Sequence, residues 1–495
     1  MGLEYKPAGR LESPSSVHLR NILAVAQDSL PIWLATIVLL ITSGCGGVSN
    51  TVLSPPPPPS PSSIPKPLVL RTLYRVVVNG TDRMTSFGPN ERNSFPLEAQ
   101  LYYVSDATGS ELTTLNRVVN SDGTDHADAV GLLGGFSLDE VLGYPWTNSA
   151  PGLVQIPEGF NSATGDHALM LPSEDLPGYV PQPLPAYGYP RYGSQGEVLL
   201  DLTVGGVTVE SNAVAGGVVW RWTWNGMQFI NNADYGRQIQ AAFYYLDPTG
   251  NLNLYNPNEA GDYYSRSIPA TAHGSPLLRF ENNGNTQSTR TIPLNWDPTV
   301  FGGDPDHPSI WDQIVLGKDV TLNFNNMGPV AQYTTHLTLP AAAQGGLAEP
   351  AVYLRANFNR FWVYDAPSKQ LTEVTGAVPP PACTTGNEYI FYTQAGGTII
   401  SDASGNFAMG VYAVDEAHGG AASFFIIGNF ICAGDGIAED SGDCVTTNAV
   451  RGGGDGIPRN ITFPAGESTY NVYLISDTLQ NVATHMDKLY QMGVK

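Results

Sequence analysis

The sequence predicts an all-β chain built from more than one domain. Charged residues make up only 14% of the 495 residues, whereas the chain has 54 glycines and 39 prolines. Low charge with many turn formers is typical of short strands joined by tight loops. Asn225-Gly226 lies between two strand-like runs, and this dipeptide favours a type I′ hairpin turn. The length exceeds one ordinary core, so we expect at least two domains.

The charge and the cysteines exclude several classes of function. The formal net charge is −22, which argues against nucleic acid as a partner, because phosphates require a basic surface. The four cysteines show no CxxC and no zinc-ligand spacing, so we predict no metal site from them. Cys432 and Cys444 could close a disulfide loop in an oxidising compartment, and two thiols are the alternative.

The N-terminal segment has the pattern of a targeting sequence. Residues 30–41 form a continuous apolar run of 12 residues, shorter than a membrane span of about 20 residues and typical of a signal-peptide core. The following Thr42-Ser43-Gly44-Cys45 resembles a bacterial lipobox, although Thr42 stands where that family has Leu. The resemblance implies a lipoprotein signal peptide over residues 1–44 and lipidation of Cys45. A plain secretory signal and an uncleaved anchor helix are the alternatives.

A proline-rich linker follows over residues 45–69. Its central part, SPPPPPSPSSIPKP at residues 54–67, favours extended polyproline II and acts as a semi-rigid spacer. A spacer after a lipidated cysteine holds a domain away from the membrane. We therefore expect a lipid-anchored envelope protein that faces outside the cytoplasm, with a secreted protein as the alternative.

A threefold repeat occupies residues 70–195. Asp82, Asp125 and Asp166 are 43 and 41 residues apart, and each lies in a tight polar turn between two strand-like runs. The repeated phrases begin at residues 73, 115 and 153, and end at Tyr103, Tyr144 and Tyr189. One such unit cannot bury its own apolar face, so we expect three to close into a β-trefoil-like domain.

The turn phrase Thr-Gly-Asp-His at residues 164–167 resembles a bacterial extracellular repeat family of unknown function. It recurs as Gly-Thr-Asp-His at residues 123–126, and Arg83 replaces the His in the first repeat. The resemblance implies a glycan-directed role for five ligand-binding residues, namely Asp82, Asp125, His126, Asp166 and His167. The alternative is structural, because Asp in such turns usually caps its own backbone and His packs on the next strand.

Residues 196–495 predict a large β domain with one helix near its C-terminus. Leu479, Val482, Met486, Leu489 and Met492 follow helical spacing, with Asp477 as the expected N-cap. Eight short strand-like runs lie at residues 320–324, 331–339, 351–354, 361–364, 389–392, 407–414, 423–427 and 470–475.

An ordered series of motifs in this domain resembles a set of uncharacterised secreted bacterial proteins. The motifs lie at residues 216–217, 234–240, 255–262, 349–353, 357–361 and 407–412. The resemblance implies a galactose-mutarotase-like β-supersandwich, a fold of many polysaccharide lyases and accessory domains of glycoside hydrolases. Fold alone does not decide activity.

Two classes of function remain open. A glycosidase needs two carboxylates, and a lyase needs a base beside a cation, here His273, His307 or His336 with Arg237 or Arg360. The catalytic candidates are Asp234, Arg237, Glu259, Asp262 and Glu349. A structural salt bridge between Asp234 and Arg237 is the alternative to a catalytic role for these two residues. The loop with Glu259 and Asp262 offers oxygen ligands for Ca²⁺, but no EF-hand spacing supports this, so we expect no cofactor.

Binding without turnover requires only aromatic faces and polar groups. Candidates are Trp222, Gln238, Gln240 and Arg360, with Tyr235, Trp296, Trp311 and Trp362 as further aromatic residues. Core packing is the alternative for any one of these aromatic residues. The sequence thus predicts a surface lipoprotein that binds extracellular polysaccharide, with cleavage undecided. The alternative is a surface adhesion or structural protein without glycan turnover.

Overall fold

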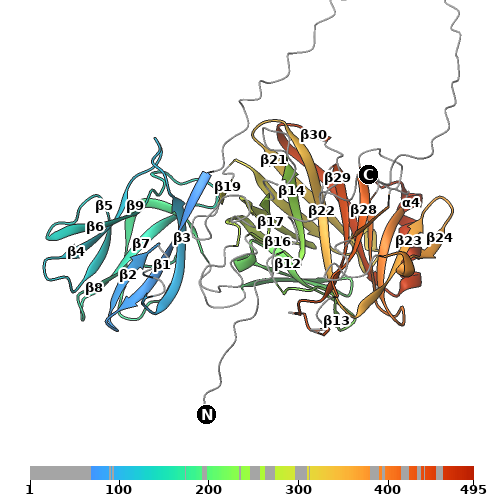
Figure 1. Ribbon diagram of the computed structural model, residues 1–495, viewed down its shortest axis with the longest axis horizontal. Coiled ribbons are helices and arrows are strands. Elements are labelled where there is room, and N and C mark those ends of the chain that lie inside the picture. The colour runs from blue at the N-terminus through green and yellow to red at the C-terminus, as the bar shows by residue number, and fades with distance from the viewer. Residues whose placement is uncertain are drawn as a thin grey trace, which may run out of the picture.

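The computed structural model confirms an all-β chain with a C-terminal helix. It describes residues 68–87, 91, 94–172, 174–191, 198–233, 236–245, 257–261, 274–295, 309–310, 313–378, 389–392, 396–413, 423–431, 436–439, 441–452 and 461–494. The repeats occupy one end of the molecule and a two-sheet sandwich the other (Figure 1). The predicted signal peptide, almost all of the linker and the predicted boundary at residue 195 lie outside the described residues. No helix in the described part is long and apolar enough to cross a membrane.

The N-terminal part consists of three units of three strands each. The strands are β1 (Leu68–Val78), β2 (Asp82–Ser86), β3 (Leu97–Ser105), β4 (Leu115–Asn120), β5 (His126–Val130), β6 (Phe136–Gly143), β7 (Val154–Asn161), β8 (Asp166–Leu169) and β9 (Val180–Pro190). In each unit the first strand lies between the other two and pairs antiparallel with both. Gly80, Gly123 and Gly165 have positive φ in the tight turns after the first strands, a conformation that glycine adopts without strain. The threefold repeat is therefore present, whereas the trefoil is not confirmed.

Strand register corrects one detail of the predicted repeat. Arg75 pairs with Thr85, Arg117 with Asp128, and Glu158 with Leu169. Glu158 is therefore the third-repeat equivalent of Arg75 and Arg117, whereas a phrase that begins at residue 153 would place Gln155 at this position. The phrase expected to begin at residue 153 begins three residues later.

The sandwich contains a nine-stranded antiparallel sheet. Its strand order is β16 (Leu277–Asn283), β17 (Thr286–Thr291), β20 (Val315–Thr321), β21 (Val330–Leu339), β31 (Gly466–Asp477), β27 (Ala408–Ala413), β26 (Gly396–Asp402), β23 (Phe358–Asp365) and β24 (Gln370–Glu373). The predicted run at residues 320–324 only overlaps β20, because a short 3-10 turn, Phe324–Asn326, follows that strand.

The second sheet faces the nine-stranded one. Its strands are β10 (Leu199–Val204), β11 (Val207–Asn212), β12 (Val218–Trp224), β13 (Met227–Gln228), β14 (Ile239–Tyr245), β22 (Ala343–Arg355), β25 (Tyr389–Tyr392), β28 (Ser423–Asn429) and β29 (Cys444–Gly452), with short β15 (Pro257–Asn258), β18 (Leu294–Asn295), β19 (Ser309–Ile310) and β30 (Ile461–Phe463). The predicted hairpin is confirmed, since Asn225 and Gly226 have φ of 47° and 78° between β12 and β13.

The main core lies between the two sheets. Buried side chains of the nine-stranded sheet, among them Tyr333 and Leu474, meet Trp222, Ile239 and Val352 of the second sheet. The indole N–H of Trp222 donates to the hydroxyl of Ser476 across this core. Such interdigitation of two inner faces is the usual core of a β-sandwich.

Helix α4, Leu479–Met492, covers part of the outer face of the nine-stranded sheet. Val482, Met486 and Leu489 are buried against β26, β27 and β31. The N-cap is Thr478, whose hydroxyl accepts from the backbone of Asn481, and not the expected Asp477. Asp477 instead accepts from the side chain of Asn481.

The repeats are joined to the sandwich by strand pairing and by a small apolar cluster. Leu68 at the start of β1 pairs with Ile310 of β19. Tyr103 packs with Ile292 and Leu294, and its hydroxyl donates to the carbonyl of Gly274 at 2.8 Å.

Candidate functional site

The three repeated aspartates meet in space. Asp82, Asp125 and Asp166 lie at the starts of β2, β5 and β8, and their carboxylate oxygens are within 4.8 Å of one another. Residues 43 and 41 apart in the sequence therefore converge because each repeat places its turn at the same point around a common centre. We call these three residues the aspartate ring.

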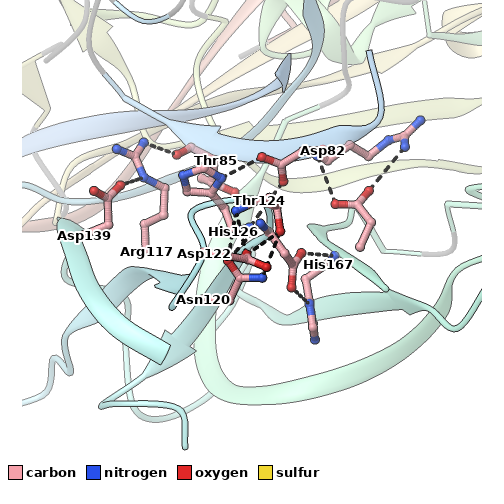
Figure 2. A network of polar contacts seen from close by, with 12 residues as sticks. Asp82, Thr85, Arg117, Asn120, Asp122, Thr124, His126, Asp139 and His167 are labelled. Carbon is pink, nitrogen blue, oxygen red and sulfur yellow. Dashed lines mark hydrogen bonds and ion pairs between the residues drawn. The ribbon is translucent and has the colours of Figure 1, made fainter. Parts of the chain in front are cut away.

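Each aspartate of the ring is held by the following repeat. The backbone N–H of His126 donates to Oδ1 of Asp82 at 3.2 Å, and Nδ1 of His126 lies 2.7 Å from Oδ2. His167 makes the same two contacts with Asp125, at 3.3 and 3.0 Å. Figure 2 shows both histidines directed at the carboxylates of the preceding repeat.

Arg83 closes the ring in place of a histidine. Its backbone N–H donates to Oδ1 of Asp166 at 3.1 Å, and its guanidinium lies 3.6 Å from Oδ2. The hydroxyl of Tyr179 also donates to Asp166. The departure from the Thr-Gly-Asp-His pattern at Arg83 therefore keeps the geometry with a longer cation.

These contacts shift the protonation of the ring. The hydrogen bond to Asp82 raises the pKa of His126, although burial opposes this. Burial raises the pKa of Asp166, although hydrogen bonds from Tyr179 and from the Arg83 backbone oppose it. Burial and the neighbouring Asp166 raise the pKa of Tyr179 to about 12. Three carboxylates this close repel, and the facing His and Arg side chains offset that repulsion.

The structure thus brings together all five residues predicted to bind a ligand in the repeats. Asp82 and Asp125 contact the next repeat through both carboxylate oxygens, and Asp166 accepts from the Arg83 backbone through Oδ1 and from Tyr179 of its own repeat through Oδ2. These contacts favour the structural alternative, a joint between repeats. The ring is also compact enough for one hard cation to touch three carboxylates. Glycan binding by the ring stays a prediction.

A second polar group lies on the outer face of the nine-stranded sheet. His336 of β21 places Nε2 at 3.0 Å from Oδ2 of Asp319 on β20, and Nδ1 at 3.0 Å from Oε1 of Glu467 on β31. Arg290 of β17 donates to both oxygens of Asp319, at 3.1 and 3.3 Å. We call Arg290, Asp319, His336 and Glu467 the sheet-face network.

The sheet-face network is held rigidly and remains reachable. The Asp319 side chain is 28% exposed, that of Glu467 59%, and those of Arg290 and His336 15% and 11%. Burial would raise the pKa of Asp319, but hydrogen bonds from His336 and Arg290 outweigh it and hold that pKa well below the usual range. Thr334 and Asn471 bond to each other on the same face.

From the sequence alone, His336 was one of three histidines available to a lyase. Its partners are 17 and 131 residues away, and only the pairing of β20, β21 and β31 brings them together. The alternation of polar and apolar residues along β21 was the available signal for its outward face.

Glu259 is a core residue. It is 0% exposed, and its carboxylate accepts from Nζ of Lys318 at 3.2 Å, from the backbone of Ala241 at 2.7 Å and from the hydroxyl of Tyr333 at 3.3 Å. Burial lowers the pKa of Lys318, although the facing Glu259 opposes this. The pair links the two sheets inside the sandwich, so Glu259 does not reach a polysaccharide here.

The other catalytic candidates do not meet in one pocket within the described residues. Glu349 is 0% exposed and forms an ion pair with Arg451 at 3.0 Å. The guanidinium of Arg237 donates to the carbonyl of Gly442. Asp234 and Asp262 lie outside the described residues. Catalysis by this set stays a prediction without geometric support.

The binding candidates of the large domain are mostly structural in this fold. Trp222 is 0% exposed in the core, so its ring cannot stack on a sugar. Gln238 and Gln240 are buried, and the amide of Gln240 bonds to Gly236 and Ala260. Arg360 is paired with Glu373 at 2.7 Å beside Trp362.

Several predicted residues lie outside the described part of the chain. These are Cys45, Tyr235, His273, Trp296, His307, Trp311 and Cys432. The predicted lipidation and the predicted disulfide therefore have no structural description. Cys444 is buried at the start of β29.

No family model and no curated protein matches the sequence. Among solved structures, the chain is similar to a putative aldose 1-epimerase from Escherichia coli K12, with 11% identity, a TM-score of 0.35, and 57% of this chain and 100% of that chain covered. A galactose mutarotase related enzyme from Lactobacillus acidophilus has 10% identity, a TM-score of 0.35 and coverages of 57% and 98%. A galactose mutarotase-like protein from Clostridium acetobutylicum has 8% identity, a TM-score of 0.32 and coverages of 58% and 96%. TM-scores this low carry no statement about the activity of this chain.

Proposed function

We propose that the chain is a lipid-anchored envelope protein that binds extracellular carbohydrate on the outer face of its nine-stranded sheet. The observation that carries this proposal is the sheet-face network, in which a guanidinium, an imidazole and two carboxylates are linked across four neighbouring strands. Sugar hydroxyls both donate and accept hydrogen bonds, and side chains of these types satisfy both roles.

The rigidity of the network supports binding. Asp319 is fixed by Arg290 and His336, so little side-chain freedom is lost when a sugar hydroxyl replaces water. The side chains stand on strands and not on loops, which keeps their spacing constant. The exposed Glu467 lies at the edge of the network, where a ligand would first meet it.

Electrostatics selects the class of carbohydrate. The chain has a net charge of −22, and the network itself contains two carboxylates against one arginine and one histidine. A polyanionic polysaccharide would meet repulsion at such a surface. We therefore favour a neutral polysaccharide.

The membrane attachment is part of the proposal. The lipobox-like Thr42-Ser43-Gly44-Cys45 and the proline-rich residues 54–67 support a lipid anchor followed by a spacer. In this arrangement the folded part stands outside the cytoplasm, where polysaccharides are present.

A binding screen tests the proposal. The purified chain is run by affinity electrophoresis through gels that contain neutral or acidic polysaccharides, beside Arg290→Ala. We expect retardation by at least one neutral polysaccharide and a loss of affinity of about tenfold or more in the variant, as one strong charge-assisted contact is removed. Arg279→Ala, an exposed arginine paired with Glu281 on β16, is the matched control.

Product analysis of the same mixtures decides between binding and turnover. Reducing ends or unsaturated products would indicate cleavage, and bound glycan without product would indicate a binding protein. Equal retardation of wild type and Arg290→Ala would contradict the proposed site.

A further inference from the structure

A second set of contacts joins the repeats, one layer away from the aspartate ring. Nη1 of Arg75 donates to the carbonyl of Leu169 at 2.7 Å, and Nη1 of Arg117 donates to the carbonyl of Thr85 at 2.9 Å. The third member is reversed, because Oε1 of Glu158 accepts from the backbone N–H of Asp128 at 2.7 Å. Strand register makes these three contacts equivalent. We call each of them a joint between two repeats.

The first two joints are neutralised by carboxylates. Arg75 forms ion pairs with Glu98 and Glu174, and Arg117 forms ion pairs with Glu91 and Asp139. A buried arginine with such partners stays charged over the whole physiological range. These joints therefore do not respond to pH near neutrality.

The third joint places two acids together. Asp128 is 3% exposed; its Oδ2 accepts from the hydroxyl of Thr85 at 2.5 Å, and its Oδ1 has no hydrogen-bond partner among the described residues. Glu158 contacts the same residue through the Asp128 backbone. Asp128 is buried and Glu158 beside it is half-buried. Ionising both carboxylates at this place is costly, and one proton reduces that cost.

The surroundings of the pair bear this out. Burial raises the pKa of Asp128 to about 6, although the hydrogen bond from Thr85 on β2 opposes this, as do Arg117, His126 and His167 on β4, β5 and β8. Burial and the negative charge of Asp128 raise the pKa of Glu158 to about 8, although the hydrogen bond from the Asp128 backbone opposes this, and Asp125 adds to the rise.

We propose that Asp128 and Glu158 form a proton-binding pair that holds the second repeat to the third and loosens that joint when the pair ionises. This inference is independent of the proposed carbohydrate function. It makes the repeat domain responsive to pH, whereas the joints formed by Arg75 and Arg117 stay constant.

Proton linkage decides whether stability rises or falls with pH. Both acids hold protons in the folded state at pH values where the unfolded chain has already released them. The contribution to stability is therefore fully present below the ordinary values of 3.8 and 4.5, and is lost as pH rises through about 6 and about 8.

Hydrogen–deuterium exchange of the full-length chain tests the pair locally. Peptides that cover β5 and β7 are followed from pH 5 to pH 9 after correction for intrinsic exchange, in wild type and in Glu158→Gln. We expect wild-type protection to fall by up to about tenfold per pH unit between pH 6 and pH 8, and this slope to be absent in Glu158→Gln. Asp122→Asn, which changes an exposed acid in the β4–β5 turn, should retain the wild-type slope.

Two further measurements keep the result decisive. Glu158→Arg recreates the arginine of the other repeats beside Asp128, and we expect its β5 and β7 protection at pH 8 to exceed that of wild type. In the wild type, nuclear magnetic resonance can follow the carboxyl carbon of Glu158 as pH is changed. We expect the midpoint of this titration to lie well above that of an ordinary glutamate. A wild-type slope that persists in Glu158→Gln, an ordinary titration of Glu158, or Ca²⁺ that restores protection at high pH would overturn the proposal.

Discussion

Nδ1 of His126 lies 2.7 Å from Oδ2 of Asp82, across the boundary between the first and second repeats. The same relationship joins His167 to Asp125, and Arg83 joins back to Asp166. Every repeat thus supplies an acceptor for the next one, so no single repeat is complete by itself. This circular arrangement explains why the Asp positions recur while the residues between them vary.

Removing one acceptor should weaken the whole repeat domain. Asp82→Ala leaves the backbone and ring N–H groups of His126 without their partner, and we expect the free energy of unfolding to fall by roughly 1–3 kcal/mol. Denaturant unfolding followed by circular dichroism measures this change. Asp122→Ala removes an exposed aspartate of the neighbouring turn and should leave the transition unchanged. An equal stability of both variants would mean that the ring does not join the repeats.

The His126–Asp82 contact should be visible in a titration. The hydrogen bond to Asp82 raises the pKa of His126 above its ordinary value of 6.5. The stability that this contact contributes is therefore fully present below pH 6.5 and is lost as pH rises through the raised pKa. Nuclear magnetic resonance of the His126 ring should show a midpoint above 6.5 in wild type. The midpoint should drop in Asp82→Ala. A midpoint that does not respond to the substitution contradicts the assignment.

The buried Lys318–Glu259 pair should show strong non-additivity. Lys318→Met leaves the Glu259 carboxylate uncompensated in the core, and we expect a loss of roughly 3–5 kcal/mol. Lys318→Met combined with Glu259→Leu removes both charges and should recover most of that loss. Urea unfolding of the two single variants and the double variant gives the coupling. Additive losses would show that the two groups do not interact.

The contact between α4 and the sheet depends on a bare backbone at Gly410. A Cβ at this position would lie 2.5 Å from Cγ1 of Val482 and from Cε of Met486. Gly410→Ala should therefore destabilise the chain by about 1–3 kcal/mol through overpacking. Gly376→Ala has open space around it and serves as the control in thermal unfolding. Unchanged stability of Gly410→Ala would show that α4 is not seated on β27.

The lipid anchor is tested by the fate of Cys45. We expect the wild-type chain in the membrane fraction and Cys45→Ser in the soluble fraction of cells, because a lipidated cysteine supplies the apolar attachment. Metabolic labelling with a fatty acid provides the second readout. A labelled Cys45→Ser, or a wild type that carries no label, would exclude lipidation at this cysteine.

Local patterns in the sequence predicted much of the fold. The Asn225-Gly226 hairpin, the helix that contains Val482 and Met486, and the spacing of the three aspartates all follow from residues close together in the chain or repeated at a constant period. These features depend on turn chemistry and periodicity. The structure moved only their details, such as the N-cap from Asp477 to Thr478.

Positions set by long-range pairing were not predictable. Glu259 was a candidate for catalysis because of its polar loop, yet Lys318, 59 residues away, holds it in the core. Glu467 gave no signal of its own, and it joins His336 only through the pairing of β21 with β31. Sequence shows which side chains can do chemistry, but strand order decides which of them meet.

Carbohydrate binding at the sheet-face network is tested most directly by following the histidine ring signals in nuclear magnetic resonance while a retained neutral polysaccharide is added. The chain has several assignable sites, with His336 in the sheet-face network, His126 and His167 in the repeats, and His485 on α4. Binding at the proposed site predicts that the His336 signals shift in proportion to occupancy while those of the other three stay in place. A shift of His126 and His167 with an unchanged His336 would contradict it and would place the carbohydrate on the aspartate ring.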